Sequence, residues 1–317
     1  MLYPLKFKPI LEERIWGGHQ LGEKMGKKLP AGKLIGESWE ISSVPGNISV
    51  ISNGKLAGNT LEELIEVYML DLVGDKIYNK FGLLFPLLIK LIDAQDALSI
   101  QVHPNDQLAK ERHNSYGKTE MWYIVDAEKD AQLCLVFNRP VTKEEYLKHV
   151  ADGTLADILA RVPVKQDDAY FIPAGAIHAI GKGILIAEIQ QNSNVTYRVY
   201  DYGRKGPDGK ERELHVEKAL QVTKREPAAK NRDFGPHVAS CEYFTVDKVV
   251  LDGLRRKKLT GEADGTSFVS VLVMSGAGKV TASGETMEVK KGDSIFITAG
   301  SGEYELEGDM EALITTV

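Results

Sequence analysis

Two histidines, a glutamine and a glutamate stand within or beside apolar stretches of this chain, and they constrain its fold more than any other feature. Gln101 and His103 are two positions apart in a strand-like pattern, so both side chains would point to the same face. Glu120 opens the next apolar stretch, and His178 follows a Pro-Ala-Gly turn after a third. Polar groups that face inward from three separate strands predict a β-barrel with a site in its interior.

These four side chains form a donor set that suits a metal ion. One amide oxygen, two imidazoles and one carboxylate suit zinc, with room left for water or substrate. Each residue alone has an ordinary explanation, because a single buried histidine is more often a core residue and a glutamate beside an apolar stretch is usually solvated. Burying several such groups without a metal or full hydrogen bonding would cost several kcal/mol. We therefore predict one zinc ion per chain, bound by Gln101, His103, Glu120 and His178.

Further motifs lie around this set along the first two thirds of the chain. They are Arg14-Ile-Trp-Gly-Gly18, Gly36-Glu-Ser-Trp-Glu-Ile-Ser42, Phe85-Pro-Leu-Leu-Ile-Lys90, Glu188-Ile-Gln-Gln-Asn-Ser-Asn-Val-Thr-Tyr-Arg198 and Tyr200-Asp-Tyr-Gly-Arg204. Together with the metal set, they resemble the type I mannose-6-phosphate isomerases, whose compact bacterial form has a similar length. The resemblance covers residues 1–225 well and the remainder weakly. It implies a cupin fold and a sugar phosphate as the small-molecule partner.

The resemblance places Lys90, Ser99, Lys118, Glu188 and Arg198 in the substrate pocket. Lys118 would project to the same side as Glu120, and beside a cation it should have a lowered pKa, suited to proton transfer or to phosphate pairing. Arg198 offers a planar fork for phosphate or for transition-state oxygens. Glu188 could orient Lys118 or Arg198, bind a sugar hydroxyl or act as the base. We assign catalysis to Arg198, Lys118 and Glu188, and substrate binding to Lys90, Ser99 and Arg198.

The reaction implied by the resemblance interconverts mannose 6-phosphate and fructose 6-phosphate through an enediol-type intermediate. Zinc would polarise the carbonyl group while a positioned base moves the carbon-bound proton. Two other functions use the same fold, namely a metal-dependent oxygenase and a sugar-binding or regulatory cupin without catalysis. The oxygenases usually have two histidines in the first motif, where this chain has Gln101. A binding protein would not need Lys118, Glu188 and Arg198 beside a complete metal set.

The organisation of the chain indicates a mainly β fold of two cupin (jelly-roll-like) β-barrels with a few short helices. Thr60 with Glu63 and Thr142 with Glu145 form capping boxes that predict helix starts. Residues 155–162 and 215–222 also have helical spacing. The charged, proline-broken stretch 224–237 predicts a boundary between a catalytic domain, 1–230, and a C-terminal domain, 231–317.

An internal similarity supports the second barrel. Residues 168–175, Asp-Ala-Tyr-Phe-Ile-Pro-Ala-Gly, resemble residues 293–300, Asp-Ser-Ile-Phe-Ile-Thr-Ala-Gly. Three residues later the first copy has His178, whereas the second has Glu303, and no Gln-x-His pair precedes the second copy. We expect the C-terminal domain to be a degenerate cupin without a metal site.

Composition excludes several function classes. The formal net charge of -6 argues against a general nucleic-acid binder. The two cysteines, Cys134 and Cys241, form no spacing motif, which is typical of a reducing compartment. The N-terminal residues lack the apolar run of a signal peptide, and the apolar stretch 83–92 is too short to span a membrane. These features predict a cytoplasmic protein without a membrane or nucleic-acid partner.

The remaining aromatic candidates are weaker. Trp16, Trp39 and Trp122 could stack on a sugar ring, but tryptophan in a β-rich core more often serves packing. His215 and the other histidines outside the metal set lack a convergent context, so we assign them no role.

Overall fold

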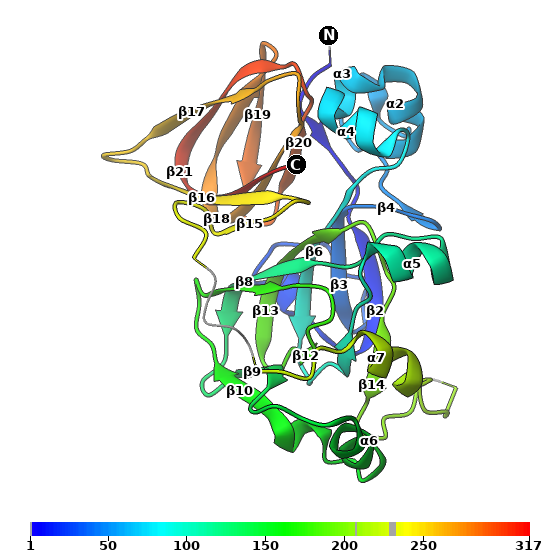
Figure 1. Ribbon diagram of the computed structural model, residues 1–317. Coiled ribbons are helices and arrows are strands. Elements are labelled where there is room, and N and C mark those ends of the chain that lie inside the picture. Colours follow the sequence, from blue (N-terminus) through cyan, green and yellow to red (C-terminus); the bar gives the residue numbers. More distant parts are fainter. Residues whose placement is uncertain (1, 207, 228–232) are drawn as a thin grey trace.

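Antiparallel strands make up most of the computed structural model, which describes residues 2–206, 208–227 and 233–317. They form an N-terminal unit of two sheets and a C-terminal unit stacked on it (Figure 1). This mainly β architecture confirms the predicted fold class. The predicted boundary between residues 230 and 231 lies outside the described residues, and the division at that point stays a prediction.

The first sheet of the N-terminal unit has the strand order β11-β8-β13-β6-β3-β2. Its strands are β2 (Ile10–Gly18), β3 (Ile35–Ile41), β6 (Leu87–Ala94), β8 (Glu120–Ala127), β11 (Ala169–Ile172) and β13 (Ile184–Gln191). The second sheet has the order β10-β9-β12-β7-β14. Its strands are β7 (Ile100–Val102), β9 (Gln132–Phe137), β10 (Leu159–Pro163), β12 (His178–Ala179) and β14 (Tyr197–Tyr200). A short hairpin, β4 (Ser43–Val44) and β5 (Asn47–Ile48), stands apart from both sheets.

The strand register of the first sheet aligns its polar residues in one row. Lys90 on β6 pairs with Trp39 on β3 and with Glu188 on β13, and Glu188 pairs with Trp122 on β8. Paired residues of neighbouring strands point to the same face of a sheet. The row therefore presents two charged side chains, flanked by tryptophans, to a single face.

The second sheet carries a corresponding row. Gln101 on β7 pairs with His178 on β12 and with Arg198 on β14. Thus the register alone places residues that are almost 100 positions apart in sequence side by side.

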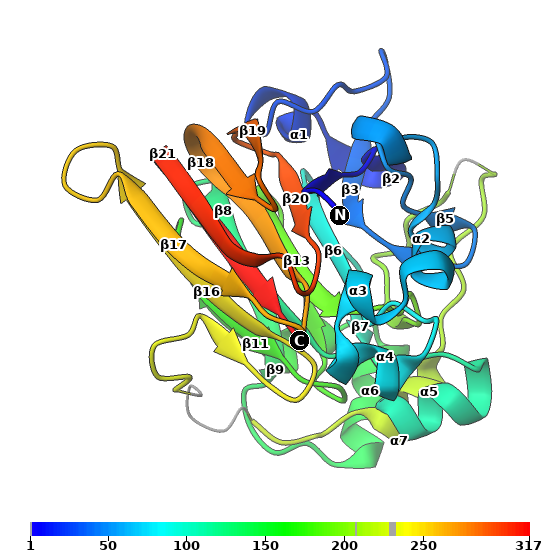
Figure 2. The ribbon, with the colours of Figure 1, turned by 90° about the horizontal axis from the view of Figure 1, so that it is seen from above.

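The opposite face of the first sheet is covered by the C-terminal unit (Figure 2). Met121 and Ile189 on that face belong to the same apolar cluster as Phe244, Leu272 and Leu313 of the C-terminal strands. Strands β6 and β13 are therefore buried on both faces. This double burial explains why their sequences are almost continuously apolar instead of alternating.

The C-terminal unit is built on an eight-stranded sheet, among the described residues. Its strands are β1 (Leu5–Lys6), β15 (Ala239–Ser240), β16 (Thr245–Asp252), β17 (Lys258–Ala263), β18 (Val269–Ala282), β19 (Glu285–Lys290), β20 (Ser294–Ile297) and β21 (Gly302–Thr316). Strand β1 comes from the chain's N-terminus and pairs with β20. The N-terminal strand is thus part of the C-terminal unit, which a division of the chain by sequence position does not capture.

Short helices connect the strands. They are α1 (Gln20–Glu23), α2 (Leu61–Tyr68), α3 (Leu70–Val73), α4 (Asp75–Phe81), α5 (Asp106–His113), α6 (Lys143–Ala151) and α7 (Val216–Val222), with 3-10 turns at Gly54–Leu56 and Leu155–Ile158. Both predicted capping boxes are present, at the starts of α2 and α6. No helix in the described part of the chain is long and apolar enough to cross a membrane.

The helix predicted over 155–162 is wrong beyond its first turn. The chain leaves the 3-10 turn at Ile158 and continues as strand β10, which pairs with β9. Pairing with a strand far along the sequence overrides the local helical spacing here. The helix predicted over 215–222 is confirmed as α7, with His215 as its N-cap.

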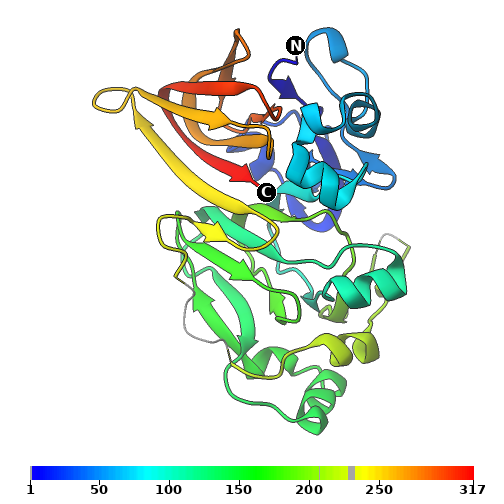
Figure 3. The ribbon, with the colours of Figure 1, turned by 45° about the horizontal axis from the view of Figure 1, so that its top comes forward.

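Helices α2 to α4 lie beside the C-terminal strands (Figure 3). The amide of Ala299 donates to the carbonyl of Leu72, and the amide of Phe268 donates to that of Val73. These contacts, with the β1–β20 pairing, fix the two units against each other.

Candidate active site

Two histidines and a glutamate converge between the two sheets of the N-terminal unit. His103 follows β7, His178 opens β12, and Glu120 opens β8 on the facing sheet. Nε2 of His178 is 3.3 Å from Oε1 of Glu120, and Nε2 of His103 is 3.6 Å from Oε2 of the same carboxylate. One ligand atom from each of the three residues lies within 4.8 Å of those of the other two, and all three side chains are buried.

The backbone orients both imidazoles for metal binding. Nδ1 of His103 lies 3.0 Å from the carbonyl oxygen of Val195, and Nδ1 of His178 lies 2.9 Å from that of Ala176. A carbonyl oxygen only accepts hydrogen bonds, so each Nδ1 carries the hydrogen and the lone pair of each ring lies on Nε2. In His103 this Nε2 accepts from Nζ of Lys118. This arrangement, in which the second ring nitrogen donates to a fixed partner, is typical of metal-binding histidines.

The electrostatics of the group also fit a cation. Burial lowers the pKa of His178 to about 4 and places the pKa of His103 well below its usual range, so both imidazoles are neutral at pH 7. Burial and the neighbouring Glu188 raise the pKa of Glu120. Nε2 of His178 and Oε1 of Glu120 are buried without a hydrogen-bond partner among the residues that the structure describes. A divalent cation would satisfy these atoms and stabilise the ionised carboxylate.

Gln101 lies next to this group. It is the cross-strand neighbour of His178, and it is two residues from His103 on the same strand-like segment. The predicted common face of Gln101 and His103 is consistent with this placement. Its role as the fourth ligand stays a prediction.

Lys118 reaches the same group from the segment before β8. Its Nζ is 2.7 Å from Oε2 of Glu120 and 3.2 Å from Nε2 of His103. Burial alone would lower the pKa of Lys118, but the carboxylates of Glu120 and Glu188 outweigh it and raise the pKa. The sequence predicted a lowered pKa because of a nearby cation, whereas the protein's own groups shift it in the opposite direction.

Glu188 connects the metal-binding group to the rest of the polar row. Its Oε2 accepts from Nε1 of Trp122 at 2.8 Å, and its Oε1 is 3.3 Å from Nζ of Lys90. Burial would raise the pKa of Glu188, but Lys118 and Lys90 outweigh it and lower the pKa. Glu188 is therefore ionised, and the charged side chains of Lys118 and Lys90 stabilise its carboxylate.

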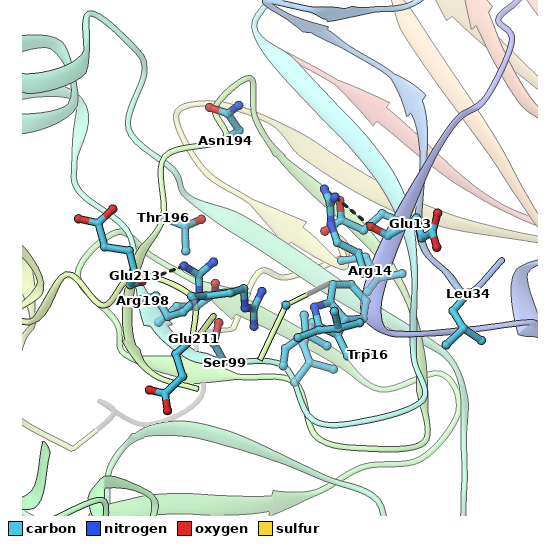
Figure 4. A pocket seen from close by; sticks show the side chains of 18 of the residues that line it. Glu13, Arg14, Trp16, Leu34, Ser99, Asn194, Thr196, Arg198, Glu211 and Glu213 are labelled. Atoms are coloured by element: carbon cyan, nitrogen blue, oxygen red, sulfur yellow. Dashed lines mark hydrogen bonds and ion pairs between the residues drawn. The ribbon is translucent and has the colours of Figure 1, made fainter. Parts of the chain in front are cut away.

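A cavity of about 1270 Å³ lies next to these side chains. Ser99, Gln101 and Arg198 line it from the second sheet, while Lys90, Lys118 and Glu188 line it from the first sheet and its approach. These six residues, all predicted from the sequence, thus line the same cavity. Figure 4 shows Arg198 and Ser99 on one side of the cavity, with Trp16 and Arg14 on the other.

Arg198 lines the cavity with part of its guanidinium group unpaired. Nη1 donates to the carbonyl oxygen of Glu213 at 3.0 Å, while Nε is buried without a partner in the described part of the chain. Burial and the nearby Arg212 lower the pKa of Arg198, although a guanidinium stays charged. An arginine in this state is suited to an anionic ligand.

Several cavity residues were not assigned from the sequence. Glu37 accepts from Nη2 of Arg14 at 3.0 Å and from Nε1 of Trp39 at 2.8 Å. Burial would raise the pKa of Glu37, but Lys90 and Arg14 outweigh it and lower the pKa. Arg14 and Glu37 lie in the motifs at residues 14–18 and 36–42, and membership of these motifs is the sequence signal that could have identified them.

The three tryptophans differ in their relation to the cavity, and the stacking role stays a prediction. Trp16 and Trp39 line the cavity, and Nζ of Lys90 lies 5.0 Å from the centre of the Trp39 ring. Trp122 is fully buried behind the ligands, against His178 and Glu188, and serves packing and positioning.

The sequence-based prediction that His215 lies apart from the site is wrong. It lines the cavity, and its Nδ1 accepts from the backbone amide of Arg198 at 3.2 Å. Its amide in turn donates to the carbonyl oxygen of Arg198 at 2.7 Å. Nothing in the local sequence signals this contact, because it depends on the chain returning from residue 198 to residue 215.

Comparisons with known proteins place this site in a family. The model of the phosphomannose isomerase type I catalytic domain matches residues 4–134, and that of the mannose-6-phosphate isomerase cupin domain matches residues 235–317. Mannose-6-phosphate isomerase ManA of Bacillus subtilis is 39% identical over 98% of both chains. The chain belongs to the type I phosphomannose isomerase family.

Other relatives agree with this assignment. A mannose-6-phosphate isomerase of Streptococcus mutans is 35% identical over 99% of this chain and 98% of its own. The crystal structure of mannose 6-phosphate isomerase from Bacillus subtilis covers 100% of both chains with a TM-score of 0.89 and 31% identity. The predicted family, cupin fold and isomerase class are confirmed, and the family assignment decides against the oxygenase and the non-catalytic cupin.

Proposed function

We propose that the chain interconverts mannose 6-phosphate and fructose 6-phosphate in a zinc-dependent reaction. The observation that carries this proposal is the buried group of His103, Glu120 and His178, next to a cavity that Gln101, Lys118 and Arg198 line. The relatives named above support the choice of substrate. The two imidazoles, whose Nδ1 atoms face carbonyl oxygens so that Nε2 carries the lone pair, and the buried carboxylate of Glu120 support the choice of zinc.

Gln101, His103, Glu120 and His178 would hold one zinc ion per chain. When bound, zinc polarises a substrate carbonyl group and favours negative charge on its oxygen. Three neutral ligands and one carboxylate leave the site with a net positive charge, which suits an anionic enediol-type intermediate. Glu120 would then be fully ionised, because the cation removes the penalty of burying its charge.

Lys118 and Glu188 are the groups placed for proton transfer. The isomerisation moves one proton between C1 and C2 of the sugar and a second proton between the oxygens on those carbons. Lys118 and Glu188 both line the cavity, and each is buried against the charge of the other. We propose that this pair moves these protons. Lys90, whose Nζ is 3.3 Å from Oε1 of Glu188, keeps that carboxylate ionised.

Arg198, Lys90 and Ser99 would bind the substrate. The guanidinium of Arg198 suits a phosphate or a developing oxyanion, and Lys205 and Arg212 also line the cavity. The cytoplasmic location and the lack of a nucleic-acid partner stay predictions of the sequence.

A coupled assay tests this proposal. Fructose 6-phosphate formation from mannose 6-phosphate is measured for the protein as purified, after treatment with a chelator, and after zinc is restored. We expect activity that is lost with the chelator and returns with about one zinc per chain. Full activity in the chelated protein would refute zinc dependence, and no turnover in the zinc-loaded protein would refute the substrate.

A further inference from the structure

The C-terminal unit contacts helix α5, whose first residue also binds the segment that carries Lys118. Tyr243 lies in the turn between β15 and β16, and its hydroxyl donates to Oδ2 of Asp106 at 2.7 Å. Asp106 is the first residue of α5, in the N-terminal unit. The two residues are 137 positions apart, so this hydrogen bond spans the two units.

The other oxygen of Asp106 holds the segment before β8. Oδ1 accepts from the backbone amide of Gly117 at 2.8 Å and from Nε2 of Gln191 at 2.8 Å. Gly117 packs so closely here that a Cβ atom would lie 2.6 Å from the backbone of Asn105 and Asp106. The carboxylate of Asp106 thus bridges the C-terminal unit and the segment from Gly117 onward.

The next two residues continue the same network. The amide of Lys118 donates to the carbonyl oxygen of Pro104 at 3.1 Å, and the amide of Thr119 donates to Oε1 of Gln191 at 2.9 Å. These bonds fix the backbone on both sides of Lys118, whose Nζ lies 2.7 Å from Glu120. The position of Lys118 in the cavity therefore depends on where Asp106 and Gln191 are held.

We infer that Tyr243 is a positioning residue, which gives the C-terminal unit a part in the reaction by fixing Asp106 and, through it, Lys118. The inference rests on the proposed function, because Lys118 is there a proton-transferring group. A group misplaced by about 1 Å can slow a reaction by about 10²-fold. Loosening one hydrogen bond of this network should have a smaller effect of the same kind.

Tyr243→Phe tests the inference, because it removes only the hydroxyl. We expect kcat to fall about 5- to 10-fold, with KM changed less than about twofold and zinc content unchanged. The matched control is Tyr123→Phe, which removes a hydroxyl that donates to Asp167 at the interface with Lys248 of the C-terminal unit. Tyr123 faces away from the site, and its variant should keep the wild-type kcat.

A double-mutant cycle tests the route through Asp106. Asp106→Asn keeps one oxygen to accept from Gly117 but cannot accept a second hydrogen bond from Tyr243 at its amide nitrogen. If the route is correct, the double variant of Tyr243 and Asp106 has the same kcat as the worse single variant. Additive losses would overturn the route, and a wild-type kcat in Tyr243→Phe would overturn the inference.

Amide hydrogen exchange separates this inference from the proposed function. We expect faster exchange at residues 114–119 in Tyr243→Phe than in Tyr123→Phe, whatever substrate the enzyme uses. Equal exchange in the two variants would show that Tyr243 does not hold this segment. If the wild-type protein fails to isomerise mannose 6-phosphate, the proposed function fails, and the exchange experiment still decides the structural link.

Discussion

The chain contains two similar strand–turn segments, one in each unit, and they differ in the residue that follows the turn. In the first, β11 leads through Gly175 to His178, which is fully buried against Glu120. In the second, β20 leads through Gly300 to Glu303, whose side chain is exposed. The two glycines share a positive φ, of +85° and +68°. The turn is thus a common structural feature, and the residue that follows it determines whether chemistry is possible.

The interiors of the two units differ in the same sense. The inward rows of the N-terminal unit present Lys90, Glu188, Gln101 and His178. The C-terminal interior is an apolar cluster that includes Val271, Val280, Ile295, Ile297 and Leu306. A cupin interior can therefore be filled with core residues or with a polar site, and the difference lies in a few inward positions.

The largest expected effect comes from removing the histidine of the first segment. His178→Ala should lose bound zinc and at least about 10³-fold of the isomerase activity, because one of the four predicted ligands is removed and the carbonyl-polarising charge is lost with the metal. Zinc content by mass spectrometry and the coupled assay measure this, and circular dichroism checks the fold. Glu303→Ala, at the corresponding place in the second segment, should change neither, and full zinc occupancy in His178→Ala would contradict the assignment.

Arg198→Lys should have the next largest effect. Lysine cannot reproduce the planar fork, so we expect kcat to fall roughly 10²-fold, by analogy with the loss of one positioned charge-stabilising donor. If Arg198 acts in the transition state, kcat and kcat/KM fall together, whereas phosphate binding alone would mainly raise KM. Zinc content should stay at the wild-type value. Near-normal kcat and KM would show that Arg198 is structural.

A substitution in the apolar interior of the second unit should affect stability rather than chemistry. Ile297 is fully buried. Ile297→Ala should lower the free energy of unfolding by about 2–5 kcal/mol through lost burial and a residual cavity. Denaturant unfolding measures this, and zinc content and kcat below the unfolding temperature should match the wild type. A loss of zinc in the folded variant would show that the two interiors are coupled.

The smallest expected effect concerns helix α2, beside the C-terminal unit. Thr60 accepts from the amide of Glu63, whose carboxylate accepts from the amide of Thr60. Thr60→Ala should lower the free energy of unfolding by about 1 kcal/mol, because one cap hydrogen bond is lost. Thermal unfolding measures this change, and we expect the isomerase activity to stay at the wild-type value. A large loss of activity would mean that α2 supports the site.

The sequence predicted those parts of the molecule that depend on local patterns. The alternation of Gln101 and His103 and the capping box at Thr60 are visible within a few residues. The capping box is confirmed, and the register places Gln101 beside His178. The family motifs supplied Lys90 and Glu188, which the strand register then brings together.

Features that depend on the return of a distant segment could not be predicted in this way. The pairing of β1 with β20, the contact of His215 with Arg198, and strand β10 where a helix was expected all require knowledge of long-range pairing. The hydrogen bond from Tyr243 to Asp106 belongs to the same class. Local sequence contains no signal for such contacts, because each partner is ordinary in its own surroundings.

The most direct test of the central claim is a crystal structure of the zinc-loaded protein with anomalous diffraction at the zinc edge. We predict one anomalous peak per chain, between His103, Glu120 and His178, with nitrogen–zinc distances of about 2.0–2.1 Å. The C-terminal unit should show none. The account would be contradicted by a chain without a peak at these residues, or by an ion coordinated by Glu303 in the C-terminal unit.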